Sequence, residues 1–418
     1  MKQMKDSGAK WIGEIPTHWK SDKLKYHLQR KEPKNPGDMT VLSLYRELGV
    51  IPKDSRDDNH NMTSEDTSKY KYVKPGNFVV NKMKAWQGSV AVSDYEGIVS
   101  PAYYVYEFTD NLYYKRYFHY LLRGCYKDEF MRLSGGMRVG QWDLSSEDLE
   151  NTLVIIPPID EQRKIAEFLD KKCEEVDGLI ADIQTQIDTL EQYKRSTITE
   201  VVTKGLNPTA EMKDSNIQWV GKIPAHWVQH PLYYYFIEHK HKNSLGEENN
   251  LLSLSYGKII RKDINTDEGL LPDNFNSYNI IDKNDIVLRL TDLQNDKRSL
   301  RTGIATERGI ITSAYLTLRS IKKINAQYFY YLLHAYDLMK VLYNMGSGVR
   351  QGLNYEELSK MMLIEPPIDE QKTIAEYLDK KCAEIDACIE EKKSQISVLE
   401  TYKKSIIFEY VTGKEEVV

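Results

Sequence analysis

The sequence predicts two mixed α/β (α+β) globular modules, each followed by a long α-helix, with the two helices paired as an antiparallel coiled coil. Three observations predict this architecture. Residues 157–203 recur without a gap at 366–412, and 28 of the 47 positions are identical. Residues 4–26 recur at 212–234 with 12 identical positions. Between these blocks each copy has short β-forming runs and one aromatic helical segment, so the chain is an internal duplication with pseudo-twofold symmetry.

Each module begins with a shared segment, Trp-x-Gly-x-Ile-Pro-x-His-Trp, which we call the strap and which occupies 11–19 and 219–227. Short runs of β-forming residues follow, and then an aromatic segment with helical spacing. The β-forming runs are 41–44, 77–80, 98–106, 285–290 and 310–318, and the aromatic helices are expected near 113–126 and 325–342. This mixture of strands and helices indicates an α+β module.

The large recurring blocks are predicted to be long helices. Each opens with Pro-Pro-Ile-Asp-Glu-Gln, at 157–162 and 366–371. Proline is tolerated in the first helical turn, and the acidic pair complements the positive end of the helix dipole. Apolar residues then follow in steps of four and three, the spacing of a coiled-coil seam. The predicted seam residues are Val176, Ile180, Ile183, Ile187, Leu190, Ile385, Ile389, Ile396 and Leu399.

Lys392 stands at the seam position that Ile183 takes in the first copy. A lone charge on such a seam is expected to extend toward solvent or to fix the register of the helices. Each helix needs a partner of similar length, and the simplest arrangement pairs the two helices with each other. Because the first helix leads into module two and the second leads out of it, the pair is antiparallel.

We therefore divide the chain into four predicted parts. Module one comprises residues 1–156, and a central spacer helix comprises 157–206. Module two comprises 207–365, and a C-terminal spacer helix comprises 366–418.

Composition limits the class of protein. At 418 residues the chain is long enough for two or three domains of about 100–200 residues each. No apolar run approaches the roughly 20 residues that cross a bilayer, and the N-terminus has no apolar signal core. We expect a soluble, cytoplasmic protein without a membrane partner.

The net charge of −5 is unevenly distributed along the chain. Residues 1–155 carry 23 basic and 21 acidic side chains, and residues 207–364 carry 19 and 17. The helical parts carry the excess acid, with 7 basic against 11 acidic residues in 156–206 and 8 against 13 in 365–418. The slightly basic modules permit DNA binding, although clustered charge would be needed to demonstrate it.

The sequence predicts no catalytic residue, no cofactor-binding loop and no metal site in this chain. The four cysteines form no Cys-x-x-Cys pair, and the nine histidines form no His-x-x-x-His pair with a helical acid. We expect those histidines to be solvent-exposed. Neither Gly-x-Gly-x-x-Gly nor a Walker lysine loop occurs, and no carboxylate pair stands with a lysine at nuclease-like spacing.

Two basic and polar stretches lie at similar distances from shared positions in the two modules. Arg, Lys, Gln and Asn are the side chains that read base edges in the major groove. The candidates are Lys82, Lys84, Trp86 and Gln87 in module one, and Arg289, Asp292, Gln294, Asn295, Lys297 and Arg298 in module two. Two modules that share a framework but differ in these loop residues could recognise two different base sequences. The alternative is that each stretch is a solvated charged loop without a binding role.

A glycine turn in each module is a second candidate DNA contact. Residues 134–136 and 346–348 are Ser-Gly-Gly and Gly-Ser-Gly, and glycine permits close approach to a backbone or base. Side chains able to donate to phosphate or guanine follow each turn, namely Arg138, Gln141, Arg350 and Gln351. A purely structural turn is the alternative.

The strap admits two interpretations. Its tryptophans could line a groove for a partner, or they could pack inside the module. We favour packing, because tryptophan beside Ile-Pro usually buries area and proline defines a turn.

This layout resembles the specificity subunit of type I restriction-modification systems, and the resemblance covers essentially the whole chain. The features that carry it are two variable modules, two near-identical helices opened by Pro-Pro-Ile-Asp-Glu-Gln, and the duplicated strap. The resemblance implies two target-recognition domains that read an asymmetric, two-part target in double-stranded DNA, which is methylated at adenine N6. It implies that the helices set the distance between the half-sites and dock two modification (methyltransferase) subunits, which a motor-nuclease restriction subunit joins.

The chain itself would then be non-catalytic, and S-adenosylmethionine, ATP and Mg²⁺ would belong to the partner subunits. The second module departs from an idealised duplicate of the first at one place, because it has Gly352-Leu353 where module one has Trp142-Asp143. Modules on a rigid rod would reach major-groove faces about one helical turn, roughly 34 Å, apart.

Two functions from other classes compete with this interpretation. The first is a bivalent protein-binding scaffold without DNA contact. The second is a self-sufficient methyltransferase or nuclease, which would need a cofactor loop that the sequence does not contain.

Overall fold

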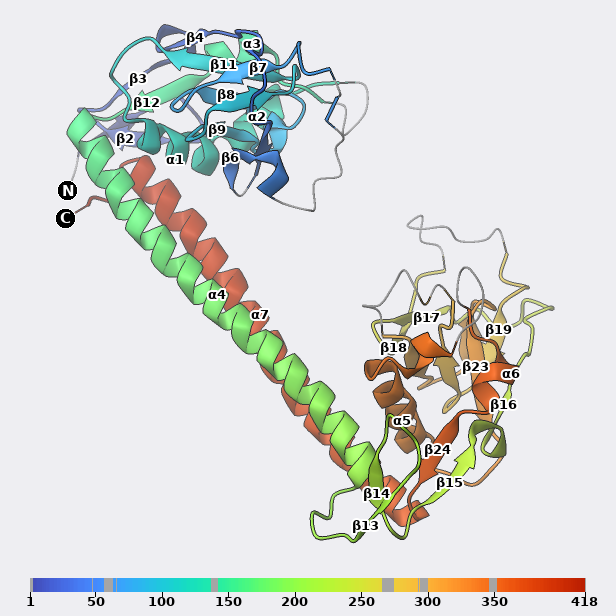
Figure 1. Ribbon diagram of the computed structural model, residues 1–418. Coiled ribbons are helices and arrows are strands. Elements are labelled where there is room, and N and C mark those ends of the chain that lie inside the picture. The colour runs from blue at the N-terminus through green and yellow to red at the C-terminus, as the bar shows by residue number, and fades with distance from the viewer. Residues whose placement is uncertain are drawn as a thin grey trace. The chain divides into compact units, whose positions relative to one another are not determined.

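The computed structural model describes residues 3–46, 48–55, 63–64, 66–136, 142–264, 274–291, 293, 300–345 and 352–417. It divides into two compact units (Figure 1). Unit 1 comprises Met1–Ile183 and Ser394–Val418, and unit 2 comprises Gln184–Lys393. Each unit therefore contains one module together with parts of both long helices.

The two long helices begin where the proline motifs predict. Helix α4 covers Ile159–Lys204, and helix α7 covers Ile368–Val411. The first turn of α4 contains Asp160 and Glu161, and that of α7 contains Asp369 and Glu370, as the helix dipole favours. Beyond their ends, Gly205 and Gly413 have φ values of +74° and +72°. Glycine adopts this left-handed conformation without a steric penalty, which explains why both helices stop there.

Within each unit, α4 and α7 lie side by side and antiparallel (Figure 1). In unit 1, Phe168 stacks on Tyr410 at 4.4 Å between centroids, and Lys403 Nζ lies 2.7 Å from Asp177 Oδ1. In unit 2, Lys194 Nζ lies 2.6 Å from Asp386 Oδ1. Residue numbers rise along α4 as those of the partners on α7 fall, so the predicted antiparallel coiled coil is confirmed.

The nine predicted seam residues are all buried or half-buried in their own units. The charged residue on the seam, Lys392, is half-buried, and its Nζ donates a hydrogen bond to Gln186 Oε1 on α4. A hydrogen bond between the helices satisfies this ammonium group without burying it fully.

Module one is built from antiparallel strands, with an aromatic helix against the sheet. Its central sheet has the order β4-β11-β8-β9, and the other strands form the pairs β1-β2, β3-β12, β5-β6 and β7-β10. The strands are β1 Met4–Asp6, β2 Glu14–Pro16, β3 Lys20–Lys23, β4 Leu28–Arg30, β5 Leu42–Tyr45, β6 Gly49–Pro52, β7 Lys71–Val73, β8 Phe78–Asn81, β9 Val90–Val92, β10 Gly97–Val99, β11 Tyr103–Phe108 and β12 Leu153–Ile156. The helices are α1 Lys115–Cys125, α2 Lys127–Leu133 and α3 Ser146–Asn151, with short 3-10 turns η1 Leu24–Tyr26, η2 Lys53–Ser55 and η3 Ala85–Gln87.

Module two repeats this plan strand for strand. Its central sheet has the order β16-β23-β20-β21, and its pairs are β13-β14, β15-β24, β17-β18 and β19-β22. The strands are β13 Met212–Asp214, β14 Lys222–Pro224, β15 Val228–Pro231, β16 Phe236–Glu238, β17 Leu252–Ser255, β18 Lys258–Arg261, β19 Asn279–Ile281, β20 Ile286–Leu288, β21 Thr302–Ile304, β22 Gly309–Ile311, β23 Leu316–Ser320 and β24 Met362–Glu365. The helices are α5 Ala326–Leu338 and α6 Tyr355–Ser359, with 3-10 turns η4 Leu232–Tyr234 and η5 Val341–Asn344.

The register confirms that the two sheets are equivalent. In module one Phe78 pairs with both Tyr106 and Val92. In module two Ile286 pairs with both Leu318 and Ile304. The β8–β9 connection in module one therefore corresponds to the β20–β21 connection in module two.

Two predicted strands were wrong in the same way. The run 98–106 is two strands, β10 and β11, because the Tyr103 N–H donates to the Ser100 carbonyl at 3.0 Å and closes a turn. The run 310–318 is likewise divided into β22 and β23, where the Tyr315 N–H donates to the Thr312 carbonyl at 3.2 Å. Ser100 and Thr312 are turn residues between apolar runs, which periodicity alone did not separate.

The expectation that the histidines are solvent-exposed was also wrong in part. His27 and His334 are buried. His27 Nδ1 lies 2.7 Å from Asp110 Oδ2, so a carboxylate satisfies one nitrogen of the buried ring, and His334 stacks on Tyr330. Pairing and ring stacking offset part of the cost of burying these polar side chains.

Candidate nucleic-acid interface

The strap packs against the start of a long helix in each unit. Trp19 is 1% exposed, and its Nε1 donates to Glu161 Oε2 at 2.8 Å, while His18 Nε2 lies 2.8 Å from Glu161 Oε1. Unit 2 repeats this arrangement with Trp227, His226 and Glu370, at 3.2 and 2.8 Å. The packing interpretation of the strap is therefore confirmed, and the glutamate of the Pro-Pro-Ile-Asp-Glu-Gln motif receives both strap side chains.

The glutamine of the same motif joins the long helix to the module's aromatic helix. Gln162 Oε1 accepts from the Tyr114 N–H at 2.8 Å, and its Nε2 donates to the Leu112 carbonyl at 2.7 Å. In unit 2, Gln371 Oε1 accepts from the Asn325 N–H at 2.9 Å. Because both glutamines are fully buried, these bonds fix the direction in which each long helix leaves its module.

The end of the other long helix completes each junction. In unit 1 the Tyr117 hydroxyl donates to the Val411 carbonyl at 2.7 Å, and a Cβ on Gly413 would lie 2.7 Å from the Trp19 ring. In unit 2 the Tyr328 hydroxyl donates to the Val202 carbonyl at 3.1 Å, and Gly205 abuts the Trp227 ring. Burial raises the pKa of both tyrosines well above the ordinary value, so both hydroxyls stay protonated and able to donate.

The candidate DNA-binding residues lie on the two equivalent sheet connections. In module one the β8–β9 connection carries an exposed Lys84 and half-buried Lys82, Trp86 and Gln87. In module two the half-buried Arg289 begins the β20–β21 connection. The two predicted stretches thus belong to equivalent strand connections in the two modules.

The segment that follows the glycine turn in sequence lies beside that connection in both modules. In module one the Leu144 N–H donates to the Lys82 carbonyl at 3.0 Å, and Gly135 pairs with Asp143. In module two the Leu353 N–H donates to the Leu290 carbonyl at 3.0 Å. Leu144 and Leu353 are therefore equivalent. This corrects the alignment inferred from sequence, because Gly352 corresponds to Asp143 rather than to Trp142.

Several candidates lie outside the described residues. These are Arg138, Gln141, Asp292, Gln294, Asn295, Lys297, Arg298, Arg350 and Gln351. Their DNA-binding roles stay predictions, as do those of the described candidates.

An aromatic pair covers the base of the loops in module one. The rings of Trp86 and Trp142 meet edge-on with centroids 5.7 Å apart, and Trp86 Nε1 donates to the Met83 carbonyl at 3.1 Å. Lys82 Nζ lies 3.5 Å from Asp143 Oδ2. The glycine turn and the β8–β9 connection are thus joined through side chains as well as through the backbone.

A buried arginine occupies this region in module two. Arg301 is 0% exposed, and its Nη1 donates to the carbonyls of Arg289 at 3.1 Å and Thr291 at 2.7 Å. Its Nε donates to the Tyr343 hydroxyl at 3.0 Å, and its backbone N–H donates to Asp337 Oδ2 at 2.7 Å. The side chain therefore joins both ends of the β20–β21 connection to the segment that precedes the glycine turn.

Sequence reasoning missed Arg301. The basic stretch recognised in the sequence ends at Arg298, and no periodicity distinguishes a buried arginine from an exposed one. The available signal is its place directly before the short segment Thr302–Ile304, which forms the largely buried strand β21.

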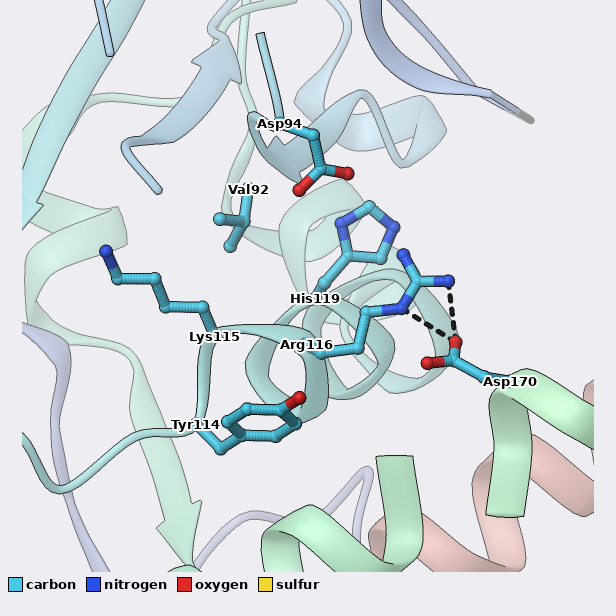
Figure 2. Close-up of a pocket in the computed structure, with 7 residues that line it drawn as sticks. All are labelled: Val92, Asp94, Tyr114, Lys115, Arg116, His119 and Asp170. Carbon is cyan, nitrogen blue, oxygen red and sulfur yellow. Dashed lines mark hydrogen bonds and ion pairs between the residues drawn. The ribbon is translucent and has the colours of Figure 1, made fainter. Parts of the chain in front are cut away.

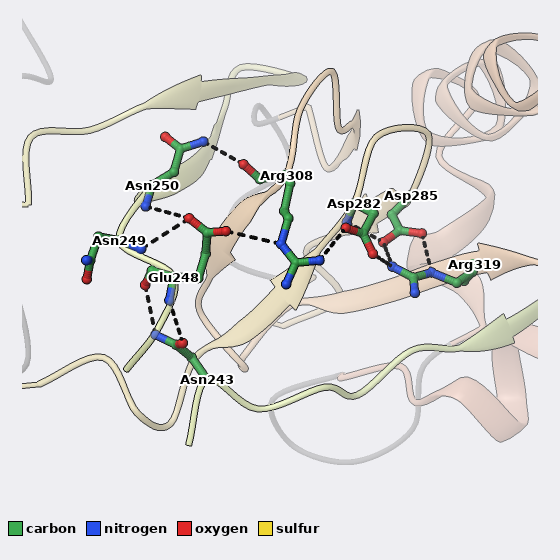
Figure 3. Close-up of polar contacts among 8 residues, drawn as sticks. All are labelled: Asn243, Glu248, Asn249, Asn250, Asp282, Asp285, Arg308 and Arg319. Atoms are coloured by element: carbon green, nitrogen blue, oxygen red, sulfur yellow. Dashed lines mark hydrogen bonds and ion pairs between the residues drawn. The ribbon is translucent and has the colours of Figure 1, made fainter. Parts of the chain in front are cut away.

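A second polar cluster in module two binds its arginines to acids (Figure 3). Arg319 Nη2 lies 2.6 Å from Asp285 Oδ2 and 2.7 Å from Asp282 Oδ2, and the hydrogen bond to Asp285 raises the pKa of Arg319. Arg308 bridges Asp282 at 3.1 Å and Glu248 at 3.2 Å. These cations are already neutralised by carboxylates, so we do not add them to the candidate DNA contacts.

Module one has a pocket of about 310 Å³ where α1 meets α4 (Figure 2). Arg116 Nη2 lies 2.6 Å from Asp170 Oδ1 on α4, and Figure 2 shows the two side chains pointing toward each other. Burial, together with the positive charges of Arg123 and Arg116, lowers the pKa of His119 to about 3, so this imidazole is neutral at pH 7. The pocket belongs to the joint between module one and its helix.

Within the described residues, no three or more His, Cys, Asp or Glu side chains are placed to hold a metal ion. None of the helices in the described part of the chain is both long and apolar enough to cross a membrane.

Comparison with known proteins gives consistent matches over most of the chain. A family model, the type I restriction modification DNA specificity domain, matches residues 28–192 and again 190–398. Two curated relatives come from Methanocaldococcus jannaschii. The putative type I restriction enzyme MjaX specificity subunit is 24% identical over 96% of this chain and 95% of its own, and the type I restriction enzyme MjaVIII specificity subunit is 27% identical over 82% of each.

A solved chain has the same fold. It comes from work described as the structural basis underlying complex assembly and conformational transition of the type I R-M system. The similarity has a TM-score of 0.69 and covers 96% of this chain and 99% of that chain, at 14% identity.

Proposed function

Because this chain belongs to the type I restriction-modification DNA specificity family, we propose that it selects an asymmetric two-part DNA target, with each module reading one part. The observation that carries this proposal is the pair of equivalent loop sites. In both modules the sheet connection accepts a hydrogen bond from a leucine that precedes the next short helix, Leu144 before α3 and Leu353 before α6. The side chains that these loops present differ between the modules.

This arrangement suits a two-part target for a physical reason. Base sequence is read by side chains that donate to or accept from base edges, while the framework fixes their approach. Modules with one framework and different side chains would approach DNA alike but recognise different bases. An asymmetric target follows from that difference.

The helices are proposed as the docking platform for partner subunits. Residues 157–203 and 366–412 share 28 of 47 positions, although the module interiors have diverged. Two near-identical surfaces fit two copies of the same partner, here the modification (methyltransferase) subunits. The motor-nuclease subunits would join them, and S-adenosylmethionine, ATP and Mg²⁺ would be bound by those partners, which leaves this chain non-catalytic.

A module exchange tests the proposal. Replacing residues 27–150 with the corresponding segment of another family member should change one half of the methylated target and leave the other half unchanged. Methylome sequencing of cells that express the hybrid complex measures both halves at once. Alteration of both halves, or of neither, would contradict the assignment of one half-site to each module.

DNA-binding measurements test the second candidate function, a protein-binding scaffold without DNA contact. Fluorescence anisotropy of a labelled duplex would be measured with the chain alone and with methyltransferase subunits. Affinity that falls steeply with salt would support phosphate contacts, because bound cations release counterions from DNA. The absence of binding in both conditions would favour the scaffold.

A further inference from the structure

The β17–β18 hairpin of module two has a tyrosine in a strained position. Ser255 pairs with Lys258, so Tyr256 and Gly257 form a two-residue turn. Their φ values are +45° and +78°. Positive φ at both central residues defines a type I′ turn, in which asparagine followed by glycine is preferred. A bulky side chain at the first position is disfavoured, so Tyr256 reduces the stability of its own turn.

The Tyr256 side chain does not offset this strain by packing in the folded protein. Tyr256 is 84% exposed, more than any other large apolar side chain in the described residues. An aromatic ring stabilises a fold by burying its surface, and this ring leaves most of its surface in water. A strained and exposed side chain that does not contribute to packing points to a role in binding.

The hairpin lies against the end of the β20–β21 connection, the segment to which the candidate DNA-binding residues of module two belong. A Cβ on Gly257 would lie 3.1 Å from the Cβ of Leu300, where the β20–β21 connection ends. The Tyr330 hydroxyl donates to the Gly257 carbonyl at 3.2 Å, which fixes the turn to α5. The turn that carries Tyr256 is therefore held between α5 and Leu300, at the end of the β20–β21 connection.

Module one repeats this placement with a different side chain. Leu48, directly before Gly49 in the β5–β6 hairpin, is 51% exposed. A Cβ on Gly49 would lie 3.5 Å from Ala91 in β9, the strand equivalent to β21. Both modules thus expose a large apolar residue at the same hairpin, which argues against a chance exposure in one copy.

We infer that Tyr256 is a DNA-contacting residue of module two, placing its ring against the flat face of a base or the sugar beside it. This inference rests on the proposed DNA-binding function. Charge supports DNA as the partner through Lys262, which directly follows the strand, is exposed, and has no carboxylate partner among the described residues. Lys258 and Arg261 are not counted, because Lys258 forms an ion pair with Asp386 at 3.4 Å and Arg261 forms one with Glu307. Ring stacking tolerates any base, so this contact adds affinity rather than sequence preference.

The substitution Tyr256→Asn separates binding from folding, because the two effects have opposite signs. It creates the preferred Asn-Gly turn, so the melting temperature of the full chain should rise by about 2–4 °C. It also removes the ring, so affinity for a duplex carrying the mapped target should fall by about 5- to 100-fold. The preferred bases should stay the same.

Two further variants complete the experiment. Tyr256→Phe keeps the ring and should recover most of the lost affinity. Tyr233→Asn removes another exposed tyrosine of module two, 56% exposed on η4, and should bind DNA like the wild type. Melting and fluorescence anisotropy would be measured on the full chain, alone and with methyltransferase subunits.

The outcomes distinguish this inference from the proposed function. If Tyr256→Asn melts higher and binds DNA as tightly as the wild type, the inference is overturned while the proposed function stands. If the variant binds DNA normally but no longer co-purifies with the methyltransferase subunit, the ring contacts protein and the inference is again overturned. A wild-type chain that bound no duplex, with or without partners, would overturn the proposed function as well.

Discussion

In module one, two tryptophan rings cover the base of the candidate loops, whereas in module two a buried arginine holds the equivalent base together. The positions correspond through the backbone. The Asn81 N–H donates to the Ser89 carbonyl at 3.1 Å, and the Arg289 N–H donates to the Arg301 carbonyl at 2.9 Å. Ser89 in one module therefore stands where Arg301 stands in the other.

This difference shows which parts of a duplicated fold are free to diverge. The junctions of strap, module and helix keep the same glutamate, glutamine, tryptophan and glycine in both units, since each makes bonds that any copy of the module needs. The loop bases keep only their backbone hydrogen bonds. The side chains at the loop bases can therefore differ between the modules, provided that each set stabilises the loops of its own module.

The largest expected effect comes from removing the buried arginine. Arg301→Ala should lower the free energy of unfolding by about 3 kcal/mol, because the carbonyl of Thr291 and the Tyr343 hydroxyl lose a charged, buried donor. The matched change Ser89→Ala in module one should cost about 1 kcal/mol or less. Urea denaturation of the full chain measures both. Equal stability of the two variants would show that the modules do not differ as proposed.

The strap junctions should respond equally in both units, which tests the shared part of the comparison. Glu161→Ala and Glu370→Ala should each lower the free energy of unfolding by about 2 kcal/mol, because each leaves a buried indole N–H without its charged acceptor. Glu167→Ala, at an exposed position on α4, is the control and should cost little. A loss in one unit alone would mean that the junctions are not equivalent.

The smallest expected effect is a pH-dependent difference in stability between the α4–α7 ion pair of unit 2 and that of unit 1. Burial acts to raise the pKa of Asp386, but the hydrogen bond and charge of Lys194, together with Lys258, outweigh it and lower the pKa below the ordinary 3.8. A lowered pKa means that the pair stabilises the fold above pH ~4 and loses this contribution as the pH falls further.

Asp386→Asn should therefore cost about 0.5 kcal/mol near neutral pH, since the pair is partly exposed, and nothing near pH 2. Thermal melting across that range measures the difference. Asp177→Asn, in the more exposed pair of unit 1, should show a smaller effect. A cost for Asp386→Asn that did not change with pH would contradict the assignment.

Much of the fold was predictable from repetition and periodicity. The starts of α4 and α7 follow from the Pro-Pro motifs, and their antiparallel pairing follows from the order of modules and helices. The single strands predicted at 98–106 and 310–318 were wrong, because a hydrogen-bonded turn inside an apolar run leaves no periodic mark. The candidate site was predictable only as two stretches per module, and the bond between Leu144 and Lys82 that joins them could not be foreseen.

The sequence by itself determined the duplication, the long helices and the family, because these depend on identity and spacing between residues that can be read along the chain. Tertiary structure alone decided that Glu161 accepts a hydrogen bond from Trp19, that Arg301 is buried at the end of the β20–β21 connection, and that the turn carrying Tyr256 packs against Leu300. Each of these depends on which distant segments meet. Contact between such segments is set by the packing of the whole unit, and no local pattern records it.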